Sequence, residues 1–236
     1  MAVLICLYFM HGHELLAVKT VKRVKGQVRE GFNYIRHTPL VRDILVMVVL
    51  MGTFAYEFQV SLALLAKYTF RGSAGVYALL NSAMGIGAVV GGLAIAGRRK
   101  TSPKSLMRMA VLFGFAMIVV SFSPNLLFAI IAMVVVGICS ISFTSLGNTI
   151  LQLESAPRMR SRVMAFWSVA FLGSTPIGGP IIGWIGEYVN PRWGIGVGGI
   201  VAIIAGIFGF IAIRYHPKQK LFKGDVLPDE ISGSTK

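Results

Sequence analysis

AMGIGAVVGGLAIAGRRKTSPKSLMR, residues 83–108, is the stretch that decides the fold. It starts as an uninterrupted apolar run that ends in a basic cluster: Arg98, Arg99 and Lys100. Gly87 and Gly91 stand four residues apart, so on a helix they share one face, and a face of small residues lets two membrane helices approach closely. A basic cluster between two apolar helices is typical of a cytoplasmic loop. The stretch therefore predicts packed membrane helices joined by such a loop.

The composition of the whole chain excludes a water-soluble protein. Of its 236 residues 55% are hydrophobic and 14% are charged, with a net charge of +14, whereas about a quarter of a soluble domain is charged. The cations lie in short segments between apolar runs, so we predict a lipid bilayer and no nucleic acid as the partner. We found no nucleophile–base pair, phosphate loop or cysteine spacing for a metal. The sequence therefore predicts a non-enzymatic protein without cofactor or metal.

Six apolar runs are long enough to cross a hydrocarbon core of about 30 Å, which needs roughly 20 residues. They cover residues 44–66, 73–97, 106–122, 126–151, 163–186 and 193–213. Because the runs are continuous rather than alternating, they favour helices over a barrel. We therefore predict an all-α fold, a polytopic membrane bundle of six transmembrane helices.

The charges predict the orientation of the bundle. All but three of the 23 Lys and Arg residues lie on one side of the predicted spans. Arg160 and Arg162 lie in one basic loop on that side, and residues 98–100 lie in another. Positive charge accumulates in cytoplasmic loops, so this side is predicted to be cytoplasmic together with both termini.

The bundle itself is predicted to occupy residues 43–214, with three further segments around it. Residues 1–18 are interpreted as the end of a truncated span and a loop, and residues 215–236 as a polar cytoplasmic tail. Residues 19–42 are interpreted as a basic amphipathic cytoplasmic helix at the membrane interface, and the alternative is a partly ordered linker. The apolar stripe of this helix consists of Val21, Val24, Val28, Phe32 and Ile35.

Glu57 is an acidic residue deep inside the first run. A carboxylate there costs on the order of 2.5–3.5 kcal/mol on insertion scales, so it needs a polar cavity, a partner or a proton. Its functional interpretation is coupling to protons or cations, or binding of a cationic group; the alternative is a neutral, hydrogen-bonded packing residue. Gln59 follows it closely, and Asn81 of the second run lies at similar depth, so they are further candidates for a substrate or proton pathway.

The fourth run contains three more candidates for that pathway: Thr144, Asn148 and Gln152. Asn148 and Gln152 are four residues apart and therefore share a helix face near the cytoplasmic end. Ser and Thr hydroxyls in membrane helices often bond to their own backbone instead, which leaves Thr144 with two interpretations.

The fifth run contains the segment GSTPIGGPIIG, residues 173–183. Gly179 and Gly183 lie on a small face, while Pro176 and Pro180 interrupt the backbone hydrogen bonds. This pattern predicts a kinked, closely packed helix that rocks, and the alternative is static close packing.

Four stretches together resemble the C-terminal six-helix half of the major facilitator superfamily, in its enterobactin-exporter-like efflux branch. REGFNYIRHTPLVRDIL (29–45) resembles the central basic segment and the start of the seventh helix of that branch. GGLAIAGRRKTSPKSLM (91–107) is similar to its loop between the eighth and ninth helices. SAPRMRSRVMAFWS (155–168) and TPIGGPIIG (175–183) resemble the loop before its eleventh helix and the glycine/proline segment of that helix.

The resemblance implies that the six spans are helices seven to twelve of a twelve-helix carrier in the cytoplasmic (inner) membrane of a bacterium. It implies alternating access and proton-coupled efflux of small amphipathic molecules such as drugs or siderophores. Because such carriers bind substrate between two six-helix halves, a second half or a homodimer is expected. The alternative is a non-transporting membrane interaction protein or the remnant of a truncated transporter gene.

Overall fold

The chain is an all-α bundle. The computed structural model describes residues 26–97, 101–173 and 175–215, and these contain helices and no strand. Within these ranges six segments are long and apolar enough to cross a membrane. The predicted fold class is therefore confirmed. The interpretation of residues 1–18 and most of the 215–236 tail fall outside the described residues.

The single-helix spans lie close to their predicted positions. They are α5 (Ala74–Ala96), α6 (Pro103–Ser121), α7 (Leu126–Glu154) and α10 (Pro191–Tyr215). Prolines at the first position of α6 and α10 suit a helix start, because a proline has no N–H to leave unpaired there. Asn125 caps α7, since its side-chain oxygen accepts a 2.9 Å hydrogen bond from the Phe128 N–H.

The first and fifth spans are interrupted, although the sequence suggested one continuous helix for the first and a kink for the fifth. The first span consists of α3 (Pro39–Phe54), α4 (Phe58–Leu64) and the π-helical turn η1 (Leu65–Thr69). The fifth consists of α8 (Arg160–Leu172), α9 (Thr175–Trp184) and the π-helical turn η2 (Ile185–Val189). Hydropathy does not register such breaks, because it is averaged over a window about as long as a span, and the few interrupting residues leave that average apolar.

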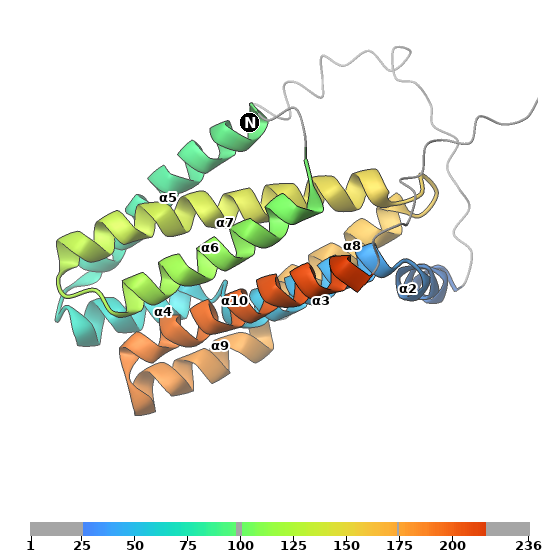
Figure 1. Cartoon of the computed structure of the whole chain (residues 1–236). Coiled ribbons are helices and arrows are strands. Elements are labelled where there is room, and N and C mark those ends of the chain that lie inside the picture. Colours follow the sequence, from blue (N-terminus) through green and yellow to red (C-terminus); the bar gives the residue numbers. More distant parts are fainter. Residues whose placement is uncertain (1–25, 98–100, 174, 216–236) are drawn as a thin grey trace, which may run out of the picture.

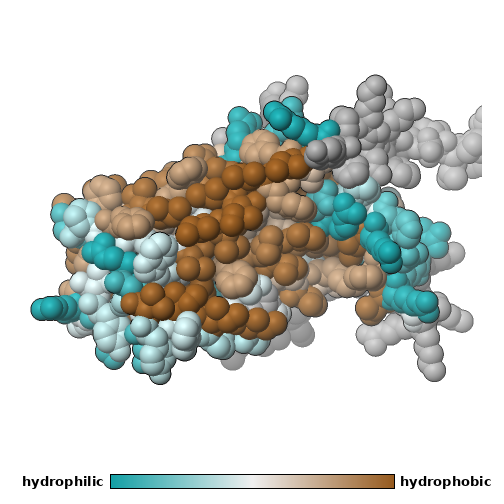
Figure 2. Space-filling view, turned by 60° about the horizontal axis from the view of Figure 1, so that its bottom comes forward, coloured by the Kyte–Doolittle hydropathy of each residue, from teal (hydrophilic) through white to brown (hydrophobic). Residues whose placement is uncertain are grey.

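The spans lie side by side, and a short amphipathic helix crosses one end of the bundle (Figure 1). Helix α5 packs mainly on α7, α6 packs on α10 and α7, and α3 lies against α10 and α8. The crossing helix is α2 (Gln27–His37), which contacts α3 and α8. Figure 2 shows a broad hydrophobic band between more hydrophilic ends, as a membrane-spanning bundle requires.

Glycines allow the closest helix contacts. A Cβ atom added to Gly87 of α5 would lie 2.0 Å from the Val134 carbonyl oxygen of α7. One added to Gly91 would lie 2.6 Å from the Ile138 carbonyl oxygen. The structure therefore places both of these glycines directly against the α7 backbone, where any side chain would separate the two helices.

Candidate functional site

The interruption between α3 and α4 forms the centre of the candidate site. Two consecutive N–H groups, of Ala55 and Tyr56, bond to the same Met51 carbonyl oxygen at 2.8 and 3.0 Å. Just before the break the Thr53 hydroxyl donates to the Val49 carbonyl oxygen at 2.7 Å, a bond that often bends helices. Glu57 then has a ψ angle of 46°, which ends the helical geometry before α4 begins. The break holds Tyr56 and Glu57 within the bundle.

The fifth span packs tightly against the first span, at this break through α9 and beyond it through η2. A Cβ atom at Gly178 would lie 1.7 Å from the Thr53 carbonyl oxygen, and one at Gly186 would lie 2.5 Å from Leu64 Cδ1. Only glycine fits at Gly178 without moving a backbone, so this residue sets the spacing of α3 and α9. Gly178 was not among the glycines predicted from the sequence to pack closely, although it lies in the same glycine/proline segment.

The Glu57 carboxylate lies in the interface between the first span and α9. The residue is 5% exposed, and its carboxylate is hydrogen-bonded to the Thr175 side chain of α9. A Cβ atom at Gly179 would lie 3.4 Å from Glu57 Oε2, so the absence of a side chain there leaves room for the carboxylate. Glu57 Oε1 is buried and has no hydrogen-bond partner among the described residues. One oxygen is therefore held and the other is unpaired.

Tyr56 lies at the meeting point of several spans. Its hydroxyl donates a 3.0 Å hydrogen bond to the Ser140 carbonyl oxygen of α7. Its ring centroid is 4.7 Å from that of Phe171 in α8, 5.3 Å from Phe113 in α6 and 5.9 Å from Phe58 in α4. These contacts join the break in the first span to three other spans, through α6, α7 and α8. Tyr56 was not predicted as a site residue from the sequence, where its position next to Glu57 was the available signal.

Two predicted pathway residues lie apart from the carboxylate. Gln59 and Asn81 are both exposed, on α4 and α5 respectively. Neither is a hydrogen-bond partner of Glu57 in the part of the chain that the structure describes. Their role in a substrate or proton pathway with Glu57 therefore stays a prediction.

The candidates of the fourth span form local contacts on α7. The Thr144 hydroxyl donates to the carbonyl oxygens of Ser140 and Ile141, each at 3.1 Å. The Gln152 side-chain amide donates to the Asn148 side-chain oxygen. Thr144 and Asn148 are half-buried, and Gln152 is exposed near the end of α7. The structure brings Asn148 and Gln152 together and leaves Thr144 bonded to its own helix.

The proline and glycine candidates lie on α9. Pro176 is in its first turn, and Pro180 is inside the helix, where it removes one backbone hydrogen bond. Gly179 faces Glu57, while a Cβ atom at Gly183 would lie 3.4 Å from Val60 Cγ1. Helix α9 therefore has an incomplete set of backbone hydrogen bonds and packs closely on the first span.

Basic residues gather at the end of the bundle near α2. Arg162 Nη1 lies 2.7 Å from Glu30 Oε2 of α2, while Arg160 is exposed. The Ala156 N–H donates a 3.0 Å hydrogen bond to the Tyr34 hydroxyl oxygen, which also ties α2 to the segment before α8. The predicted loop residues 98–100 lie outside the described part of the chain.

The geometry defines a polytopic helical membrane protein with a buried carboxylate where two interrupted spans meet. Among the described side chains, no group of three or more His, Cys, Asp or Glu residues could hold a metal ion. The model of the transmembrane secretion effector family matches residues 1–223, so the chain belongs to that family. This family is of the major facilitator type, and the chain is therefore an integral, multi-pass membrane transporter. A search of curated proteins finds no match.

Proposed function

We propose that the chain is the C-terminal half of a proton-coupled carrier that exports small amphipathic molecules, such as drugs or siderophores, by alternating access. The observation that carries the proposal is the buried Glu57 carboxylate between two interrupted spans, with one oxygen that has no hydrogen-bond partner among the described residues. An ionisable residue inside a membrane span is rare and marks proton or substrate pathways. The family membership and the resemblance to enterobactin-type exporters support the same function.

The surroundings of Glu57 suit a proton site that responds to helix movement. The Thr175 hydroxyl lies on α9, so movement of α9 relative to the first span changes the hydrogen bonding of the carboxylate. Pro180 weakens the backbone of the same helix, which favours such movement. In this proposal Glu57 binds a proton in one conformation and releases it in the other.

The exposed apolar faces support a second six-helix half, or a second copy, as the partner. Helices α5 and α8–α9 belong to the two least buried spans within the described residues. Large apolar side chains such as Ile86 (62% exposed) and Leu172 (70% exposed) project from them. Carriers with repeated halves bind substrate between those halves, so we assign these faces to the interface around the substrate.

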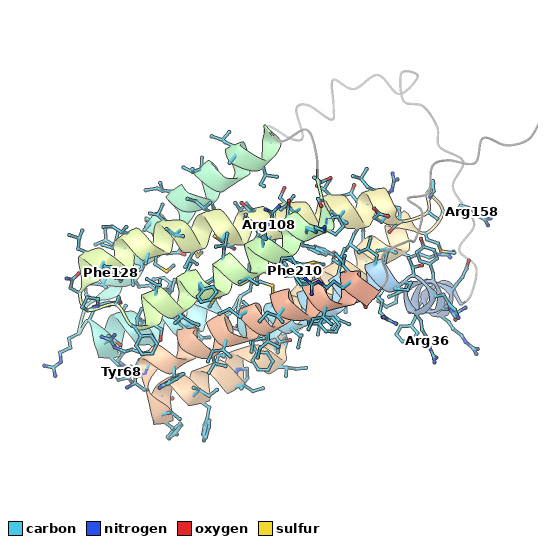
Figure 3. All side chains as sticks on the ribbon, viewed as in Figure 1. Arg36, Tyr68, Arg108, Phe128, Arg158 and Phe210 are labelled. Carbon is cyan, nitrogen blue, oxygen red and sulfur yellow. The ribbon has the colours of Figure 1, made fainter. Side chains whose placement is uncertain are left out.

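The charge distribution supports a location in the bacterial cytoplasmic membrane with both termini in the cytoplasm. Arg36 and Arg158 lie at one end of the bundle, and Tyr68 and Phe128 lie at the other (Figure 3). Basic residues favour the cytoplasmic side, and aromatic residues favour membrane interfaces. Alkaline phosphatase fused at Phe128 should be active, whereas a fusion at Arg158 should be inactive; the reverse pattern would contradict this orientation.

Transport into inverted vesicles that contain the complete carrier tests the role of Glu57. A pH gradient drives uptake, with ethidium and a catecholate siderophore as probes. We expect Glu57→Gln to reduce gradient-driven uptake about tenfold or more, because the amide keeps the size and the Thr175 contact but takes up no proton. Glu187→Gln is the matched control, since Glu187 is exposed in η2. Uptake with an unchanged rate and pH dependence in Glu57→Gln would remove this residue from the mechanism.

A non-transporting membrane interaction protein remains the second candidate function. It is favoured by the extent of the apolar faces on α5 and α8–α9, which suit a partner whether or not substrate passes between them. Vesicles that contain this chain without any second half test the non-transporting role. Substrate accumulation in those vesicles would contradict the non-transporting role.

A further inference from the structure

A groove lies between α2, α3 and α8, away from Glu57. Its volume is about 320 Å³, and its lining is apolar except for Arg42. Helix α3 forms the long wall, while Phe32 of α2 and Phe166 of α8 form the sides. Helix α2, which lines one side of the groove, crosses one end of the bundle (Figure 1).

The shape of the groove suits a single hydrocarbon chain. Its α3 wall runs from Arg42 to Leu50, which is about 12 Å at the helical rise per residue. That length is most of one leaflet of the hydrocarbon core, which is roughly 15 Å deep. Phe32 is 60% exposed and Val49 is 44% exposed, so apolar surface in the groove is left uncovered by the protein. An elongated apolar occupant would cover this surface.

The polar end of the groove is positively charged. The Arg42 guanidinium is held by Asp43, with Nη2 2.9 Å and Nε 3.0 Å from the same carboxylate oxygen. The Arg42 side chain remains 45% exposed, so the guanidinium has N–H groups left to donate to a ligand. Arg29 and Arg36 of α2 are exposed and stand one turn on either side of Phe32. The nearby Glu30 is already paired with an arginine.

We propose that the α2–α3–α8 groove binds one acyl chain of an anionic phospholipid, with the phosphate group against Arg42 and Arg36. The apolar lining and the cations at one end match the two parts of such a lipid. The lipid would brace α2 against the fifth span, alongside the Glu30–Arg162 ion pair. This inference concerns only the α2–α3–α8 groove and leaves the rest of the α8–α9 face to a second half. It is independent of the transported substrate, of proton coupling and of the direction of transport.

Native mass spectrometry of the purified full chain tests the site. The protein is titrated with phosphatidylglycerol and with phosphatidylcholine that carries the same acyl chains. We expect phosphatidylglycerol to bind at least about fivefold more tightly, since each cation near an anionic headgroup contributes about 1 kcal/mol. Equal binding of the two lipids by the unmodified chain would overturn the proposal.

Two kinds of variant separate the headgroup from the acyl chain. Arg42→Gln should remove the preference for phosphatidylglycerol, because it weakens phosphatidylglycerol binding more than the binding of phosphatidylcholine, whose choline cation already offsets the phosphate charge. Because Arg42→Gln leaves buried Asp43 without its partner, Arg36→Gln provides a second headgroup test on an exposed residue. Val49→Trp should fill the groove and weaken the binding of both lipids. Retained wild-type binding in Val49→Trp, or a retained preference in Arg36→Gln and Arg42→Gln, would contradict the site.

Two control variants lie outside the groove, and a cross-linking experiment identifies what occupies it. Arg108→Gln and Val119→Trp remove an exposed arginine and enlarge an exposed valine on α6, outside the groove, and should bind both lipids as the wild type does. A photoreactive residue at Val49 should form an adduct with phospholipid in membranes. A cross-link from this position to residues 1–25 or to a second copy of the chain, in place of lipid, would show that a protein segment occupies the groove.

Discussion

The first and fifth spans share one local plan but have opposite surroundings. Each consists of two α-helices followed by a π-helical turn, with its interruption near that of the other span. Within the described residues the first is the most buried of the six spans and the fifth is the least buried. Met47 and Leu62 of the first span are fully buried, whereas Val169 of the fifth is 67% exposed. The same kind of interruption therefore occurs in a buried span and in a span that is largely uncovered.

This difference shows what each break contributes. In the first span the break places Tyr56 and Glu57 inside the bundle, where other helices supply their hydrogen-bond partners. In the fifth span the second helix supplies Thr175 and the close approach at Gly178 while its outer face stays uncovered. We therefore expect substitutions to destabilise the protein at most positions of the buried span. In the uncovered span we expect this only where it contacts the neighbouring span.

The largest expected effect is at the contact between the two spans. Gly178→Ala places a methyl group 1.7 Å from the Thr53 carbonyl oxygen, so α3 and α9 must separate. We expect the free energy of unfolding to fall by about 3 kcal/mol, the upper range for overpacking. Unfolding of the purified chain in mixed micelles with dodecyl sulfate, followed by circular dichroism, measures it. Gly183→Ala is the control, because its Cβ atom meets Val60 at 3.4 Å. Equal stability of the two variants would mean that the close approach is absent.

The second largest effect on the free energy of unfolding is expected when a leucine of the first span is shortened, compared with a leucine of the fifth span. Leu62→Ala leaves a cavity where the first span is fully buried, and we expect it to lower the free energy of unfolding by about 2 kcal/mol. Leu172→Ala on the fifth span removes a side chain that is 70% exposed, and we expect a change below about 0.5 kcal/mol. The same unfolding titration measures both. A larger loss for Leu172→Ala would show that the fifth span is covered within the chain itself.

A smaller loss of stability is expected when a hydroxyl group of the first span is removed, compared with a hydroxyl group of the fifth span. Tyr56→Phe removes the 3.0 Å hydrogen bond from the first span to the Ser140 carbonyl oxygen of α7, which we expect to cost about 1 kcal/mol of stability. Ser168→Ala on the fifth span removes a 3.2 Å bond to Met164 of the same helix, and we expect almost no change. Unfolding measurements on both variants check the difference. Identical stabilities would mean that the bond across the helices contributes nothing.

The smallest effect concerns the link between α2 and the fifth span. Arg162→Gln breaks the 2.7 Å pair with Glu30 and should lower stability by about 0.5 kcal/mol, as is usual for partly exposed pairs. Arg160→Gln is the control, since Arg160 is exposed. A double-mutant cycle with Glu30→Gln measures the coupling, which should decline in high salt. A coupling of zero at low salt would show that other contacts hold α2 in place.

Much of the architecture could be predicted from the sequence, and the site could be predicted only in part. The span from 73 to 97 was predicted within one residue of α5 at each end, because a run of about 20 apolar residues has few alternatives in a membrane. Glu57 was identifiable because a carboxylate is conspicuous in such a run. Its contacts with Thr175 and Gly179 were not identifiable, since they depend on how α9 is rotated about its axis against the first span.

By itself, the sequence determined the class of protein, the number of spans and the uneven distribution of basic residues. These properties follow from local sums of hydropathy and charge, which need no knowledge of neighbouring helices. The tertiary structure alone decided where the first span breaks, which glycines touch another backbone and which oxygen of Glu57 is bonded. Such features arise when several helices pack simultaneously, because each helix rotates and bends to fit its neighbours.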